Sequence, residues 1–162
     1  MTHNGATGKD ADTTAILMVS AEPFLLLEAE KDLRERMIPG EEVDLNYMMV
    51  YGWEARLADT LEFLQTLPFL GNRRLLVIRE IQKFDEWKQL TGYLKDPNPS
   101  SLLLMTSSEL KRSNAQFKAL SANAKISELR RPYGKALVKW VDDRFKREGK
   151  ETGICIILGA EY

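Results

Sequence analysis

The turn after the first apolar run of the chain is the place where an α/β protein of this kind would bind a phosphate. The run AILMVS (residues 15–20) has the length of a buried strand, and the turn that follows it reads SAEP (residues 20–23). A phosphate-binding loop here would contain glycines, whose backbone amides surround the phosphate, and a lysine that reaches it. This turn has neither, and the carboxylate of Glu22 would repel a phosphate. Gly8-Lys9 precedes the run and lacks the second glycine, so it does not supply the motif.

The end of the third apolar run is the second place where nucleotide chemistry would be visible. LLVI (residues 75–78) is followed by Arg79 and Glu80. A working nucleotide hydrolase carries an acidic residue at the first of these positions, because a carboxylate there holds the magnesium ion. Arg79 places a cation where the metal would sit, and Glu80 is expected to be an ordinary solvated carboxylate. We therefore expect no ATP or GTP binding, no hydrolysis, no cofactor and no metal.

Other catalytic chemistries lack their residues. The chain has one cysteine, Cys155, which cannot form an internal disulfide or a cysteine-based zinc site, and one histidine, His3, in a polar segment. A dinucleotide-binding fingerprint and a nucleophile elbow are both absent from the sequence. We expect no catalytic residues.

Charge and hydropathy limit the partners. The chain has 162 residues, with 23 basic and 24 acidic side chains and a net charge of −1, so it has no overall basic field. The second half is locally basic. Such charged faces are ordinarily just solvated, and contact with nucleic acid is the alternative interpretation. The apolar stretch at residues 154–158 is too short to cross a membrane, and residues 1–14 lack the apolar segment of a signal peptide. We expect a cytoplasmic protein without membrane contact.

One connection carries an unusual pair of apolar residues. Pro68 ends an amphipathic helix, Gly71 indicates a turn, and Phe69 and Leu70 lie between them. Folding back onto the core is the ordinary fate of such side chains. An adjacent Phe-Leu pair held outward on a turn would instead anchor a partner protein.

Apolar runs alternate with amphipathic helices along most of the chain, which predicts a parallel sheet with helices on both faces. The runs are apolar throughout rather than alternating, as strands covered on both sides require. We predict strands at residues 15–20, 46–52, 75–78, 101–106 and 125–129, with helices from Pro23, at 54–67, around 84–94, at 115–122 and after Pro132.

The order of these segments resembles the delta subunit of bacterial DNA polymerase III, the clamp-opening subunit of the clamp loader. AILMVSAEPFLLLEAEKDL resembles the opening strand and helix of that family, and LQTLPFLGNRRLLVIREIQKF resembles its most characteristic stretch. SLLLMTSSELKRSNAQFKAL is similar to its fourth strand and basic loop, and LVKWVDDRFKREG to the first helix of its second domain. The resemblance covers about residues 15–149.

The resemblance implies a three-layer AAA+-type core with a five-stranded parallel sheet, flanking helices and a degenerate nucleotide site. Residues 1–13 are small and polar and are expected to form a disordered tail. The resemblance implies a core domain at 14–132 and the truncated start of a lid domain at 133–162, of which residues 152–162 do not match the family.

The resemblance also implies a function: a subunit of the DNA polymerase III holoenzyme, a nucleotidyltransferase complex, that binds the sliding clamp (the beta subunit) and opens its ring. The clamp-binding residues would be Phe69 and Leu70, with Pro68 and Arg73 beside them. Other loader subunits and primer-template DNA would be partners of the full-length protein. Two alternatives stay open: a functioning AAA+ or P-loop NTPase domain, and an unrelated doubly wound α/β enzyme domain.

Overall fold

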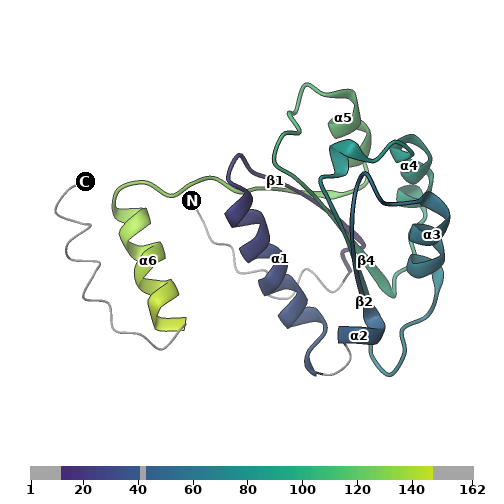
Figure 1. Ribbon diagram of the computed structural model, residues 1–162, viewed down its shortest axis with the longest axis horizontal. Helices are drawn as coiled ribbons and strands as arrows, with labels where there is room; N and C mark the ends of the chain where they lie inside the picture. Colours follow the sequence, from purple (N-terminus) through teal and green to yellow (C-terminus); the bar gives the residue numbers. More distant parts are fainter. Residues whose placement is uncertain (1–11, 41–42, 148–162) are drawn as a thin grey trace. The chain divides into compact units, whose positions relative to one another are not determined.

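The computed structural model describes residues 12–40 and 43–147 (Figure 1). These residues form two compact units, which divide between Leu129 and Arg130. The first unit contains the whole sheet and the second contains a single helix. The predicted tail up to residue 11 and the last part of the predicted lid fragment, residues 148–162, lie outside the described residues.

The first unit is built on a five-stranded sheet in which every neighbouring pair is parallel. The strand order is β2-β3-β4-β1-β5, so β1 and β4 are neighbours although most of the unit separates them in sequence. The predicted fold class is therefore confirmed. The strands are β1 (Ala15–Val19), β2 (Tyr47–Tyr51), β3 (Arg74–Arg79), β4 (Ser101–Ser107) and β5 (Lys125–Glu128).

Helices cover both faces of this sheet (Figure 1). One face is covered by α1, and the other by α3, α4 and α5. Their bounds are α1 (Pro23–Met37), α2 (Val43–Asn46), α3 (Leu57–Gln65), the short 3-10 helix η2 (Ile81–Lys83), α4 (Trp87–Lys95) and α5 (Ala115–Ser121).

The two cores follow from the alternation of side chains along each strand. On β3, Leu75 and Val77 pack against α1, whereas Leu76 and Ile78 pack on the opposite face. All four of these side chains are completely buried, which is why the strand is apolar at every interior position.

Most element boundaries differ from the predicted ones by one to three residues. The predicted strand at 46–52 begins one residue later, because Asn46 ends the four-residue helix α2. The predicted helix at 54–67 is shorter at both ends and ends at Gln65, so Pro68 lies three residues beyond it. The segment after β3 forms η2, which the sequence pattern did not indicate.

The second unit contains α6 (Lys135–Arg147), in which no residue is fully buried. Lys146 forms an ion pair with Asp142 one turn earlier, at 2.8 Å, and the guanidinium of Arg144 lies 5.6 Å from the centre of the Trp140 ring. Some of the basic charge in this half is thus paired within the helix.

No helix among the described residues is long and apolar enough to cross a membrane.

Candidate functional site

The first candidate site is the region at the carboxyl ends of β1, β4 and the neighbouring β3, which we name the crevice because open parallel sheets usually have one at this position. β1 leads into α1 on one face of the sheet, whereas β4 leads into α5 on the other face. Open parallel sheets usually bind ligands where the connections of neighbouring strands leave to opposite faces. A nucleotide would therefore be expected at the ends of these two strands.

Polar side chains fill this crevice and bond to one another. The backbone amide of Ser20 donates to the carbonyl of Ser107 at 3.2 Å, which joins the ends of β1 and β4. The hydroxyl of Ser107 donates to the Gln82 side-chain oxygen at 2.6 Å and accepts the amide of Leu110 at 2.9 Å. The side-chain nitrogen of Gln82 donates to Glu80 at 2.5 Å. These polar groups at the strand ends are thus partnered within the chain.

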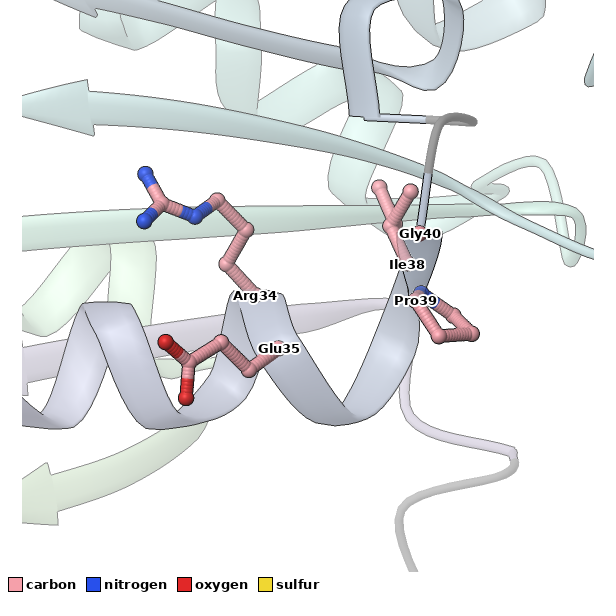
Figure 2. A pocket seen from close by; sticks show the side chains of 5 residues that line it. All are labelled: Arg34, Glu35, Ile38, Pro39 and Gly40. Carbon is pink, nitrogen blue, oxygen red and sulfur yellow. The ribbon is translucent and has the colours of Figure 1, made fainter.

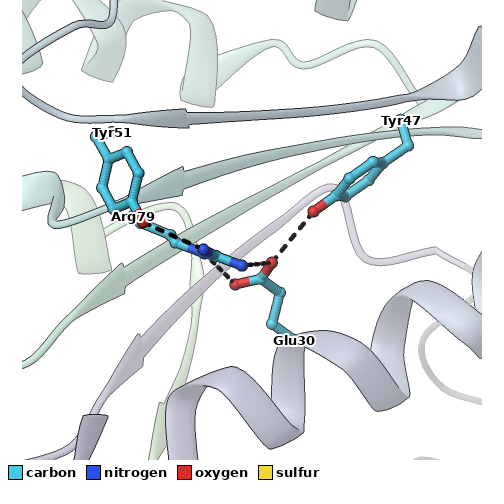
Figure 3. Close-up of polar contacts among 4 residues, drawn as sticks. All are labelled: Glu30, Tyr47, Tyr51 and Arg79. Atoms are coloured by element: carbon cyan, nitrogen blue, oxygen red, sulfur yellow. Dashed lines mark hydrogen bonds and ion pairs between the residues drawn. The ribbon is translucent and has the colours of Figure 1, made fainter. Parts of the chain in front are cut away.

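Arg79, at the position where a hydrolase would hold magnesium, forms a buried ion pair (Figure 3). Its guanidinium donates two hydrogen bonds, both 2.8 Å long, to the two carboxylate oxygens of Glu30, which is 2 % exposed. The bond to Glu30 raises the pKa of Arg79 further above its ordinary value. The guanidinium of Arg79 therefore stays positively charged at the end of β3, and it would repel a metal ion there.

Two tyrosines of β2 complete this ion pair (Figure 3). The hydroxyl of Tyr47 donates to Glu30 at 3.2 Å, and that of Tyr51 accepts from Arg79 at 3.4 Å. Burial, and then the negative charge of Glu30, raise the pKa of Tyr47 above 10.0. The cluster joins α1, β2 and β3, so its polar atoms serve the fold.

The end of β3 is fixed by a close backbone approach. The amide of Gly52 donates to the carbonyl of Arg79 at 2.7 Å. A Cβ atom on Gly52 would lie 2.3 Å from the carbonyl oxygen of Glu80, so only glycine fits there. Glu80 itself has a left-handed backbone with φ of 56°. The predicted solvated carboxylate is instead half-buried, and it accepts hydrogen bonds from Gln82 and Ser108.

A pocket near the end of α1 offers no chemistry. It is lined by Arg34, Glu35, Ile38, Pro39 and Gly40. Figure 2 shows that the two charged side chains extend back along the helix, away from Ile38 and Pro39. Within the described part of the chain, no cluster of three or more histidine, cysteine or acidic residues could hold a metal.

The second candidate site is the α3–β3 turn, residues 66–73. Three large apolar side chains in it are strongly exposed: Leu67 is 73 %, Phe69 is 59 % and Leu70 is 79 % exposed. Folding back onto the core, the ordinary fate of such residues, does not occur here. An exposed cluster of this kind indicates a surface that binds another protein.

The backbone of the turn is strained at one of these residues. Leu70 has φ of 56°, in the left-handed region that bulky residues rarely adopt. The neighbouring Gly71 does not use that region, although glycine adopts it without strain. Strain of this kind persists only where the surrounding structure enforces it, and it is common at functional sites.

Asn46 bonds to the residue just before this strained leucine. Its side chain is completely buried and bonds to both backbone groups of Phe69: the amide of Phe69 donates to Oδ1 at 2.8 Å, and Nδ2 donates to the carbonyl of Phe69 at 2.7 Å. The two bonds fix the orientation of this peptide segment. The phenyl ring is therefore exposed while its own backbone is anchored.

Two arginines follow the turn. Arg73 donates to the carbonyl oxygens of Thr13, at 2.5 Å, and Ser101, at 3.5 Å. Arg74 donates to the carbonyl of Leu45 at 3.3 Å, and its guanidinium lies 3.9 Å from the centre of the Phe63 ring. Burial lowers the pKa of Arg74 from its ordinary value. Both side chains join the turn to neighbouring elements.

The family model described as the delta subunit of DNA polymerase III matches residues 17–130, which include both candidate sites. The chain belongs to this family. The resemblance noted from the sequence is thereby confirmed, and with it membership in the delta-subunit family of the clamp loader. No curated protein matches the chain significantly.

Solved structures agree on the fold of this family member. The DNA clamp loader delta protein of Bacillus subtilis has a TM-score of 0.67 at 22 % identity, over 83 % of this chain and 43 % of that one. A DNA polymerase III gamma subunit-related protein from Thermotoga maritima has a TM-score of 0.61 at 11 % identity, over 84 % and 48 %. A RuvB variant from the same organism has a TM-score of 0.55 at 14 % identity, over 84 % and 44 %. The chain spans less than half the length of each.

Sequence reasoning missed the residues that support the two sites. Asn46 was assigned to a strand, and Glu30 was not singled out at all. A glutamate at position 30 lies one turn before Leu33 and Arg34, on the stripe that packs on the sheet, which was the available signal for a buried carboxylate. Nothing in the local pattern of Asn46 pointed to the turn 23 residues later.

Proposed function

We propose that the α3–β3 turn is the surface through which this delta-family chain binds the sliding clamp, the beta subunit, and takes part in opening its ring. Phe69 and Leu70 would insert into an apolar pocket of the clamp. The observation that carries this proposal is the exposure of both side chains on a turn whose backbone is anchored from below.

The energetics of protein interfaces support this assignment. A few large apolar or aromatic side chains carry most of the binding free energy, each worth about 2 kcal/mol or more on truncation. Two adjacent anchors would thus supply about 4 kcal/mol, which is roughly a thousandfold in affinity. Pro68 restricts the chain just before them. Arg73 would contribute less, since its guanidinium already binds two carbonyl oxygens within the chain.

The state of the crevice supports a binding role rather than catalysis. Its polar groups bond to one another, and the cation of Arg79 lies where a metal would be needed. The chain would then act inside the DNA polymerase III loader by contact, with ATP hydrolysed by other subunits. Assembly with those subunits, an approach to primer-template DNA and a cytoplasmic location belong to the same proposal.

The test is retention of a bacterial sliding clamp by the variant in which Phe69 and Leu70 are both alanine. We expect the affinity to fall roughly a thousandfold, because both anchors are removed. The free energy of unfolding should change by less than about 0.5 kcal/mol, as is usual for exposed side chains. Binding is measured by surface plasmon resonance, and stability by urea denaturation.

A matched control is available on α1. Phe24 and Leu27 are also an exposed apolar pair, each 47 % exposed, and their double alanine variant should retain the clamp like the parent chain. Unchanged clamp affinity in the Phe69, Leu70 variant would refute the proposal. So would a loss of several kcal/mol in stability, because the pair would then be part of the core.

A further inference from the structure

The exposed side chains of Phe69 and Leu70 do not hold the backbone of the α3–β3 turn in place. Their side chains face solvent, and Leu70 holds a left-handed conformation that is unfavourable for leucine. A free turn of this composition would relax into other conformations. Something outside the turn must therefore hold it in the observed one.

The contacts of Asn46 meet this need directly. One carboxamide pairs with both the amide and the carbonyl of Phe69. Asn46 is completely buried, although Phe69 itself is exposed. Breaking these bonds is costly, since the buried carboxamide would then lack its partners.

The element that carries Asn46 is itself secured. α2 has only four residues and could not hold its own position as an isolated helix. Arg74, from the start of β3, donates to the carbonyl of Leu45 and stacks over Phe63 of α3. α2 is thus joined to β3 and α3 on one side and to Phe69 on the other.

We infer that Asn46 is a positioning residue for clamp binding: it holds the α3–β3 turn in the conformation that presents Phe69 and Leu70. This inference rests on the proposed function. Asn46 is completely buried, so its effect would come through the backbone of Phe69. By holding the anchors before binding occurs, it lowers the conformational entropy that association must remove.

The first test uses the unaltered chain. Amide hydrogen exchange of Phe69 should be markedly slower than that of Leu70 and Gly71, because the Phe69 amide alone among the three is bonded to the buried Asn46. Equal exchange rates for the three amides would overturn the inference without any variant and without the clamp.

The second test is the clamp affinity of Asn46→Ala, compared with Asn98→Ala. Asn98 is the matched control: its side chain also bridges backbone groups, donating to the carbonyl of Leu64 at 2.9 Å and accepting the amide of Ser100 at 3.0 Å. We expect Asn46→Ala to weaken clamp binding about tenfold after correction for the folded fraction. Asn98→Ala should leave the corrected affinity unchanged.

The outcomes separate this inference from the proposed function. If loss of both anchors abolishes clamp binding while Asn46→Ala does not weaken it, the clamp site stands and the positioning role fails. If the anchors themselves prove dispensable, the proposed function fails, and the exchange of Phe69 still decides whether Asn46 holds the turn. Should Asn46→Ala not fold, the same-sized Asn46→Asp, which keeps only the acceptor, replaces it, with the same tenfold loss expected and an unchanged affinity contradicting the role.

Discussion

Two regions of the same unit differ in how far their side chains are partnered within the chain. They are the crevice at the ends of β1 and β4 and the α3–β3 turn. In the crevice, polar and charged groups are bonded to one another, from the Arg79–Glu30 ion pair to the bond between Ser107 and Gln82. In the turn, the backbone is bonded and the large apolar side chains are left in water. The polar groups of the crevice have partners within the chain, whereas the apolar side chains of the turn are not covered by other residues.

This contrast shows where the chain can still gain free energy from a partner. A ligand entering the crevice would have to break hydrogen bonds that already exist, so little would be gained. A partner covering the turn would remove exposed apolar surface from water, at about 25 cal/mol per Å². The strand ends, where this architecture usually binds a nucleotide, therefore offer little to a ligand, whereas the exposed turn is the surface that we propose to bind a partner.

The largest effect should come from breaking the internal pairing of the crevice. Arg79→Ala leaves the carboxylate of Glu30, whose side chain is 3 % exposed, buried without its cation. Removing one partner of a buried ion pair typically costs about 3–5 kcal/mol, and we expect a loss of that size in urea denaturation. The clamp affinity of the folded fraction should stay unchanged, because the turn does not depend on this pair.

A paired replacement provides the control for this prediction. Glu30→Leu combined with Arg79→Met removes both charges and leaves no buried ion unpaired, so most of the lost stability should return. A cost below about 1 kcal/mol for Arg79→Ala would show that the ion pair does not hold the crevice together.

A smaller effect on stability should separate the backbone strain at Leu70 from the loss of its side chain. Leu70→Gly and Leu70→Ala both remove the anchor, but only glycine adopts the left-handed conformation without strain. We expect Leu70→Gly to be more stable than Leu70→Ala by about 1 kcal/mol in urea denaturation. Both variants should bind the clamp equally poorly, and a less stable glycine variant would argue against the left-handed turn.

Much of this contrast could be foreseen from local sequence. Runs such as LLVI gave the interior strands because full burial on both faces requires apolar residues at every position. The absence of glycines after β1 and the cation at Arg79 are the reasons to expect no nucleotide chemistry there, and this expectation stays a prediction. The exposed Phe69-Leu70 pair was visible because a proline and a glycine flanked it.

The hydrogen bonds that hold the crevice and the turn in place could not be foreseen, since they join residues that are far apart in sequence. Arg79 meets Glu30 across 49 positions of sequence, and Asn46 meets Phe69 across 23. The sequence indicated a turn at Gly71, but the left-handed residue is Leu70. Backbone strain at a leucine is imposed by tertiary contacts, so propensity alone points to the wrong residue.

The smallest effect should appear in alkaline solution, through Tyr47. Burial and the nearby Glu30 raise the pKa of Tyr47 above 10.0 in the folded chain, so folding favours its neutral form. The stability that this supplies is fully present below pH 10 and is lost as the pH rises through the raised pKa. The difference in unfolding free energy between the parent chain and Tyr47→Phe should therefore be constant from about pH 7 to 9 and shrink above pH 10.

The flat region between about pH 7 and 9 is the internal control of this measurement, because the tyrosine is neutral there in both the folded and the unfolded chain. The hydroxyl of Tyr47 donates to Glu30, so its loss in Tyr47→Phe sets the constant offset, whereas ionisation sets the slope. A difference that grows above pH 10 would mean that the folded chain favours the phenolate. The guanidinium of Arg34, which lies 5.3 Å from the centre of the Tyr47 ring, would then outweigh Glu30 at this hydroxyl.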